Sequence, residues 1–195
     1  PCQEQDPATD EADAEIVEKL AELNKLVESG KVPKALTEVR KLYKESGHLR
    51  AGYALSQLIA QRCETLAKSN RKKAHELFVE GGELARELLA NPEFPDAVRE
   101  EVRSAIYNQA CSEAVMEDAE ASQKSLGDLF AMGFEDFSQI EDDRDFAKLL
   151  KEETFQAFIA DARQAVVEKV LRQAREEIAA FESFPFDFTT SDLAE

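Results

Sequence analysis

The apolar residues of this chain recur every three or four positions over most of its length, which is the period of amphipathic α-helices. A first stripe covers residues 16–27 and stops at Ser29-Gly30. A second stripe follows Pro33, which suits the first turn of a helix because its missing N–H has no partner there, and stops at Ser46-Gly47. The pattern therefore predicts a helical hairpin with a tight glycine turn.

The same spacing predicts two further hairpins. The second has apolar stripes over residues 53–66 and 74–88, and the third has stripes over 98–114 and 126–129 after a proline-rich linker at 91–95. Gly81-Gly82 lies inside a predicted helix and costs ~2 kcal/mol relative to two alanines, so we interpret the pair as a close approach between helices, with a hinge as the alternative. Ala35 and Ala74, near the starts of second helices, are expected to face close neighbours.

The last long stripe runs from Phe155 to Phe181 and predicts a helix of roughly 28 residues. We expect the helical array itself to cover the apolar face of this helix, with a partner protein as the alternative. The run is too short and too mixed to predict a coiled coil from spacing alone. Residues 1–10 have no apolar period and are expected to be disordered. The expected organisation is thus a disordered segment (1–10), an all-α helical repeat domain (11–182) and a tail (183–195).

A more specific pattern lies between Tyr107 and Phe158. Small residues occupy one helix face, a Gly-Phe break follows, and acidic and aromatic residues end the segment. The pattern consists of Tyr107-Asn108-Gln109-Ala110-Cys111, Ala114, Ala121, Ser125, Leu126, Leu129, Gly133-Phe134, Ile140, Asp142, Asp143, Asp145-Phe146, Leu149 and Phe155-Gln156. It resembles the end-of-group form of the tetratricopeptide repeat, the unit that closes such an array.

This resemblance implies three tetratricopeptide-like helical hairpins of unequal spacing, a closing segment and a long C-terminal helix. It also implies a domain that binds a protein or peptide and does not catalyse a reaction. Within the closing segment we expect Gly133 to adopt a left-handed conformation, which glycine adopts cheaply. Phe134, Phe146 and Phe155 are expected to be buried beneath the preceding hairpin. The neighbouring acids are expected to cap a short helix.

The tail alternates aromatic and polar residues after a proline, which is typical of a strand. Its sequence is Phe184-Pro185-Phe186-Asp187-Phe188-Thr189-Thr190-Ser191-Asp192-Leu193. It resembles the opening of a bacterial redoxin, a thioredoxin-like domain in which a Pro, an Asp-Phe, a Thr and an Asp-Leu precede the first hairpin. The resemblance implies that 183–195 is a linker and the first strand of a redoxin domain continuing beyond Glu195. The helical part would then position that domain, recruit its clients, or complete its substrate site; the alternative is a frayed tail.

The composition and charge of the chain limit the kinds of partner that it is expected to bind. Gly and Pro are scarce (7 and 6 residues), as expected of a helical chain. The formal net charge of −17 repels phosphate backbones, so we expect no nucleic-acid partner. We interpret the acidic surface as one that favours solubility; the alternative interpretation is that it binds a basic partner. Because no apolar run approaches ~20 residues, no membrane span is expected. Oligomeric state stays open, and a dimerisation module built on the long helix is a third hypothesis.

The three cysteines, Cys2, Cys63 and Cys111, form no Cys-x-x-Cys pair, so neither a local redox motif nor a zinc knuckle is predicted. Cys63 and Cys111 fall inside predicted helices and are interpreted as buried packing residues, although a disulfide between them stays open. Pro1 precedes Cys2, which disfavours a lipidated N-terminal cysteine. The chain starts without Met, so it is either a trimmed piece, with a cytoplasmic location, or a secreted or periplasmic chain whose signal peptide is gone.

Candidate catalytic chemistry is sparse. His48 and His75 follow no metal-ligand spacing and are interpreted as surface or packing residues. Asp142, Asp143 and Asp145 lack the glycine and the final acid of a calcium-binding EF-hand loop. No glycine-rich phosphate loop is present. The sequence therefore predicts no catalytic residue, no metal ligand and no cofactor site, and it leaves the ligand-binding residues unknown.

Overall fold

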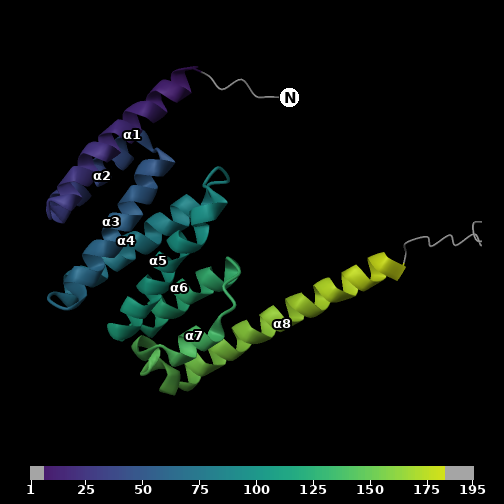
Figure 1. The fold of residues 1–195 in the computed structure, drawn as a ribbon. Helices are drawn as coiled ribbons and strands as arrows, with labels where there is room; N and C mark the ends of the chain where they lie inside the picture. The colour runs from purple at the N-terminus through teal and green to yellow at the C-terminus, as the bar shows by residue number, and fades with distance from the viewer. Residues whose placement is uncertain (1–6, 183–195) are drawn as a thin grey trace, which may run out of the picture.

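The computed structural model describes residues 7–182, and about 85% of the described residues are helical with no strand among them (Figure 1). The expected all-α class is therefore confirmed. In chain order, with η marking short 3-10 helices, the elements are α1 (Pro7–Glu28), α2 (Val32–Ser46), α3 (Leu49–Ala67), α4 (Arg71–Ala90), α5 (Asp96–Val115), α6 (Ala119–Ala131), α7 (Phe137–Asp142), η1 (Arg144–Phe146), η2 (Leu149–Lys151) and α8 (Glu153–Glu182).

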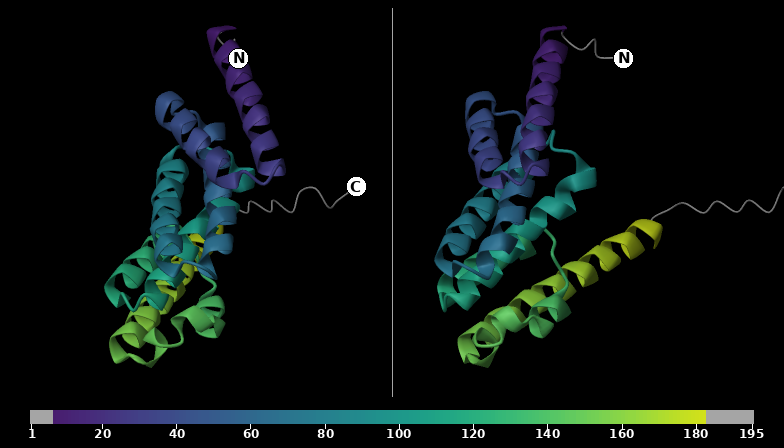
Figure 2. Two further views of the ribbon diagram at one scale, coloured as in Figure 1. Left: turned by 90° about the vertical axis from the view of Figure 1, so that its left-hand side faces the viewer. Right: turned by 60° about the vertical axis from the view of Figure 1, so that its left-hand side comes forward.

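Successive helices from α1 to α6 pack against one another as three pairs joined by short turns, stacked from α1 at one end to α7 and α8 at the other (Figure 2). The helix α3 also contacts α1 and α5, so the first helices of successive pairs lie along one side of the stack. Ala35 and Ala74 are almost completely buried, as expected of positions that face a close neighbour. None of the helices in residues 7–182 combines the length and the apolar content that a membrane crossing requires.

The N-terminal segment differs from the prediction. The helix α1 begins at Pro7, so residues 7–10 are helical and the expected disorder is wrong for them. Proline is tolerated in the first turn of a helix, and no glycine interrupts the sequence between this turn and the apolar stripe, so the helix extends upstream of the stripe. Residues 1–6 and the tail 183–195, with its expected strand, lie outside the described residues.

The closing segment after α6 packs an aromatic cluster against α5 and α8. Phe146 and Phe155 are fully buried, as expected, and their rings stack with centroids 6.1 Å apart. Phe134 is only half-buried, which corrects the expectation for that residue. One side of its ring contacts Tyr107, at a centroid distance of 5.7 Å, while the turn that carries it lies at the surface.

Gly133 makes this turn with a φ of +86°, which confirms the expected left-handed conformation. A Cβ atom at this position would meet no atom within 4 Å, so replacement is opposed by the backbone alone. We expect Gly133→Ala to lower the free energy of unfolding by about 1–2 kcal/mol. The matched control is Gly127→Ala in α6, where a Cβ also has open space but φ is not positive; it should stabilise by about 1 kcal/mol. Equal effects of both changes in urea denaturation would contradict this assignment.

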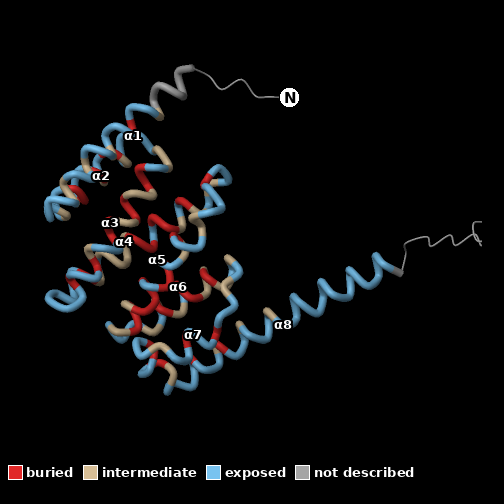
Figure 3. Tube along the Cα trace, viewed as in Figure 1, coloured by how far each residue is buried: buried red, intermediate tan, exposed pale blue. Residues whose placement is uncertain are grey.

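The long helix α8 is covered by the array only along its first turns. Phe155 and Ile159 are buried, and Val166 still packs on the core. From Val167 onward the helix extends away from the body as an arm, and residues 167–181 are exposed (Figure 3). The expectation that the array covers the whole apolar face is therefore wrong. The reason is geometric: α8 contacts α6 and η2 near its start, and its straight axis then diverges from the stack.

Candidate functional site

The side of the stack formed by α3 and α5 carries three adjoining hollows that share one residue, Asn108. Their volumes are about 280, 340 and 270 Å³, and their walls come from α3, α4, α5, α6 and the closing segment. The Asn108 side chain is exposed at the point where the three meet. An amide group can both donate and accept hydrogen bonds, as a peptide backbone can.

A fourth hollow continues this surface toward α1. It has a volume of about 450 Å³, is lined mainly by apolar residues of α1 and α3, and shares Gln57 with one of the hollows at Asn108. Its walls include Leu20, Leu23 and Leu58 and contain no charged residue. We call the four hollows together the groove; it runs from α1 across α3 and α5 to the closing segment.

The charges that line the groove lie in its half near the closing segment. The acids there outnumber the bases: Glu64, Glu100, Glu101, Asp143 and Asp145 against Arg71 and Arg103. Arg103 is already ion-paired with Glu100, at 2.7 Å. The groove is therefore apolar at its α1 end and negatively charged at the other.

Asp143 organises the acidic end through three contacts, two to α5 and one to η1. Its carboxylate accepts hydrogen bonds from the Tyr107 hydroxyl (3.1 Å), the Cys111 thiol (3.6 Å) and the backbone N–H of Asp145 (2.9 Å). The last contact caps η1, which bears out the expected capping role for Asp143. The expectation is wrong for the helix directly after the Gly-Phe turn, because α7 is capped by Asp136 and not by Asp142, Asp143 or Asp145. Burial, together with the nearby Asp143 carboxylate, raises the pKa of Asp145, while Arg71 opposes this shift. The two carboxylates thus face each other with little compensating positive charge.

Ligand atoms of Cys111, Asp143 and Asp145 lie within 4.8 Å of one another, so the fold brings together a group that could hold a metal ion. Sequence reasoning did not find this group, because Cys111 is on α5 and the acids are in the closing segment. Its chemistry is a poor match for a cation: burial raises the pKa of the Cys111 thiol well above its usual range, and a protonated thiol is not a metal ligand. The hydrogen bonds to Asp143 account for the arrangement.

The other cysteine and both histidines have structural contacts. Cys63 and Cys111 are free, buried thiols, as expected of packing residues, and no disulfide joins them. Burial raises the pKa of Cys63 to about 12, so it is not an activated nucleophile. His48 caps α3 by accepting the Arg50 N–H, and its Nε2 lies 2.7 Å from Asp13. His75 joins α4 to α5 through the Ser112 hydroxyl, at 3.0 Å.

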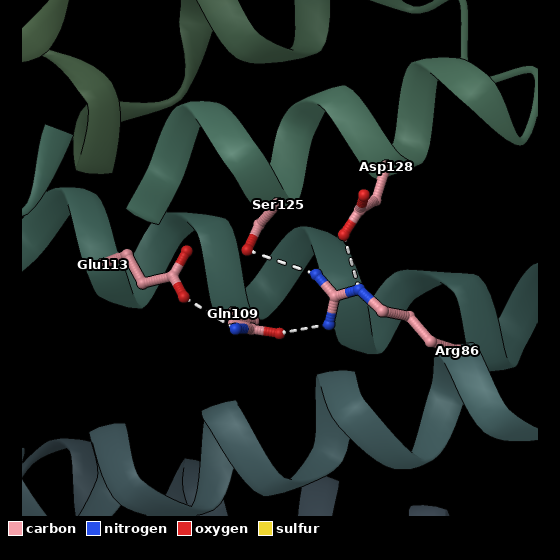
Figure 4. A network of polar contacts seen from close by, with 5 residues as sticks. All are labelled: Arg86, Gln109, Glu113, Ser125 and Asp128. Atoms are coloured by element: carbon pink, nitrogen blue, oxygen red, sulfur yellow. Dashed lines mark hydrogen bonds and ion pairs between the residues drawn. The ribbon is translucent and has the colours of Figure 1, made fainter. Parts of the chain in front are cut away.

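A polar network behind the groove fixes α5 between its neighbours (Figure 4). The Arg86 guanidinium donates to Asp128 at 2.6 Å and to Gln109 at 2.8 Å, and it also contacts Ser125 at 3.3 Å. Gln109 in turn donates to the buried carboxylate of Glu113 at 2.6 Å. Because Gln109 adjoins Asn108 in α5, the network sets the position from which Asn108 enters the groove.

Gly81-Gly82 lets α4 approach this network. A Cβ on Gly82 would lie 1.9 Å from Oε1 of Gln109, and one on Gly81 would lie 3.0 Å from Ile59. The close-approach interpretation of the pair is confirmed. Such contacts explain why a helix interior tolerates two residues of poor helix propensity.

In comparisons with known proteins, no family model matches the chain, and neither a curated protein nor a solved structure is significantly similar to it. The assignment of the groove residues as a candidate binding site therefore rests on their geometry alone. One sequence signal could have found Asn108: it belongs to a polar, uncharged pair, Asn108-Gln109, which interrupts the apolar and small positions of the third hairpin.

Proposed function

We propose that this chain binds an extended segment of a protein or peptide along the groove. The observation that carries the proposal is the continuity of the hollows from α1 to the closing segment, with the exposed amide of Asn108 where three of them meet. An extended backbone leaves its N–H and C=O groups available, and a side-chain amide can satisfy one of each. The role requires no catalytic group.

The charge distribution specifies the chemistry of the ligand. The apolar walls near Leu20 and Leu23 favour an apolar side chain at one end of the segment. The acidic residues that outnumber the bases at the other end favour a Lys or Arg side chain of the ligand. We therefore propose a segment with an apolar residue toward α1 and basic residues toward Asp143 and Asp145.

Two broader proposals accompany this one. The stacked helix pairs and the turn at Gly133 support a tetratricopeptide-like array with an end-of-group closing unit. The association with a redoxin rests on Phe184–Leu193, which lies outside the described residues, and on nothing else in the chain. Sequencing the gene beyond Glu195 tests it, since a thiol pair shortly downstream is the feature a redoxin requires.

Binding can be tested with fluorescein-labelled peptide pools of equal length that differ only in carrying Lys or Glu beside a leucine anchor. We expect the lysine pool to raise the fluorescence anisotropy with this protein and the glutamate pool to leave it unchanged. Glu64→Lys, in the groove, should weaken binding about tenfold or more, since a close attraction becomes a repulsion. Asn108→Ala should weaken binding of the same pool by the loss of its hydrogen bonds.

The matched control is Glu83→Lys, an equal charge change at an exposed residue of α4 that lines none of the hollows. It should bind like the unaltered protein after correction for net charge. Equal weakening by Glu64→Lys and Glu83→Lys would show that the peptide is attracted unspecifically to the acidic protein, and it would contradict the groove proposal. Equal binding of both pools would remove the preference for basic segments.

A further inference from the structure

The arm of α8 carries an apolar stripe that the described part of the body does not cover. Val167, Val170, Leu171 and Ile178 are 52%, 52%, 50% and 58% exposed, and Ala174 is exposed between them. Single exposed apolar side chains are common on protein surfaces. Four of them that are about half exposed along one helix are unusual. The stripe therefore requires an explanation of its own.

Most of this stripe lies on a different side of the helix from the face that packs on the body. At about 100° per residue, Val167, Leu171, Ala174 and Ile178 lie roughly 120° around the helix from the line of Phe155, Ile159, Ala162 and Val166, and Val170 lies between the two sides. Lys169, on the body side, reaches toward Glu135 at 3.8 Å. Straightening or bending α8 against the array would therefore bury the wrong side of it.

The stripe has the spacing of a short helix pair. Val167, Leu171, Ala174 and Ile178 are separated by four, three and four residues, the alternation of a heptad seam. Glu168 and Arg175 are seven residues apart and so lie along the same edge of this seam. Opposite charges on one edge suit a partner helix that carries the same two charges in reverse order.

We propose that α8 pairs in antiparallel orientation with α8 of a second copy of this chain. Leu171 then packs against the partner's Ala174, Val167 packs against the partner's Ile178, and the two-fold axis repeats both contacts. In this register Glu168 faces the partner's Arg175 on one side of the axis, and Arg175 faces the partner's Glu168 on the other. The surface thus complements itself in both shape and charge.

The alternative orientation and registers are less favourable. Shifting the antiparallel register by one heptad in either direction sets Glu168 against the partner's Glu168, or Arg175 against the partner's Arg175. A parallel pair would set Glu168 against the partner's Arg163, but Arg163 is already bound to Glu141 at 2.7 Å and lies over the Phe137 ring. A parallel pair also brings together the bodies of two chains that each carry a net charge of −17, whereas an antiparallel pair holds the bodies at opposite ends.

The pairing is weak and reversible. The seam from Val167 to Ile178 covers only about 18 Å of helix. Such a contact buries less than the ~800 Å² per partner of a standard stable interface. The dimer is therefore expected to form in a concentration-dependent manner, with its stability sensitive to each flanking charge pair.

Sedimentation equilibrium of the whole chain over a concentration series tests the proposal by charge exchange. Glu168→Arg and Arg175→Glu should each weaken self-association about tenfold, because each replaces both attractive pairs with repulsive ones. An equimolar mixture of the two variants should associate again, since the heterodimer restores both attractions. The double variant Glu168→Arg/Arg175→Glu should self-associate like the unaltered chain. Circular dichroism confirms that each variant keeps its helix content.

The matched controls are Glu176→Arg and Arg172→Glu, which make the same charge changes on the arm but away from the seam. Both should self-associate like the unaltered chain. Monomers at every concentration, or a mixture that fails to associate, would overturn the proposal. Weakening by Glu168→Arg with no effect of Arg175→Glu would show parallel pairing instead. The peptide-binding test is independent of these outcomes, because the groove lies on other elements.

Discussion

Replacing Phe146 with alanine is expected to lower the free energy of unfolding by about 3–5 kcal/mol. The ring is fully buried and fills the space between α5 and the start of α8. It makes an edge contact with Tyr107 at a centroid distance of 5.9 Å and stacks on Phe155 at 6.1 Å. Because Tyr107 and Phe155 belong to different elements, the cavity would loosen the closing segment from both. Urea denaturation followed by circular dichroism measures the loss.

Phe134→Ala is the matched control for this change. Its ring also touches Tyr107, but the residue is half-buried, so its truncation removes less apolar surface from the core. The expected loss is about 1–2 kcal/mol. If both substitutions cost the same, Phe146 would not be the residue that holds the closing segment on the array.

Replacing Gly82 with alanine is expected to cost about 2–4 kcal/mol, although alanine is the better helix former by about 1 kcal/mol. The added methyl group would lie 1.9 Å from the Gln109 amide oxygen, so that side chain must move. Its displacement breaks the hydrogen bonds from Arg86 and to Glu113. Glu113 is only 4% exposed and its Oε2 has no hydrogen-bond partner among the described residues, so losing Gln109 leaves the carboxylate unsatisfied.

A double-mutant cycle separates this clash from a general disturbance of α4. In a Gln109→Ala background the obstructing amide is absent and only the Cβ of residue 109 remains, 3.1 Å from the added methyl group. Gly82→Ala should then cost much less than it does beside Gln109. Gly127→Ala, in open space, shows the opposite sign expected of alanine when nothing obstructs it. Additive losses in the cycle would mean that the Gly82 contact with Gln109 is not the cause.

The local structure of this protein could be predicted from its sequence because the helices are amphipathic and clearly punctuated. Glycine and proline breaks at Gly47 and Pro92 marked the ends of elements, and the apolar period marked their length. Buried positions at stripe centres, such as Leu88 and Ile106, followed from the same period. These properties depend on residues within one or two turns of each other. Such information is present in any short window of the chain.

Contacts between distant segments were decided only by the tertiary structure. Cys111 contacts Asp143, which lies 32 residues further along the chain. Asn108 is a candidate binding residue only because other helices form the walls of the hollows around it. The sequence also determined that α8 has an apolar face, but not what covers this face. The stripe from Val167 to Ile178 has the composition of a buried face, yet its side chains are exposed and do not contact the body. Periodicity reports which face of a helix avoids water, whereas the direction of its axis relative to the stack decides which partner can satisfy that face.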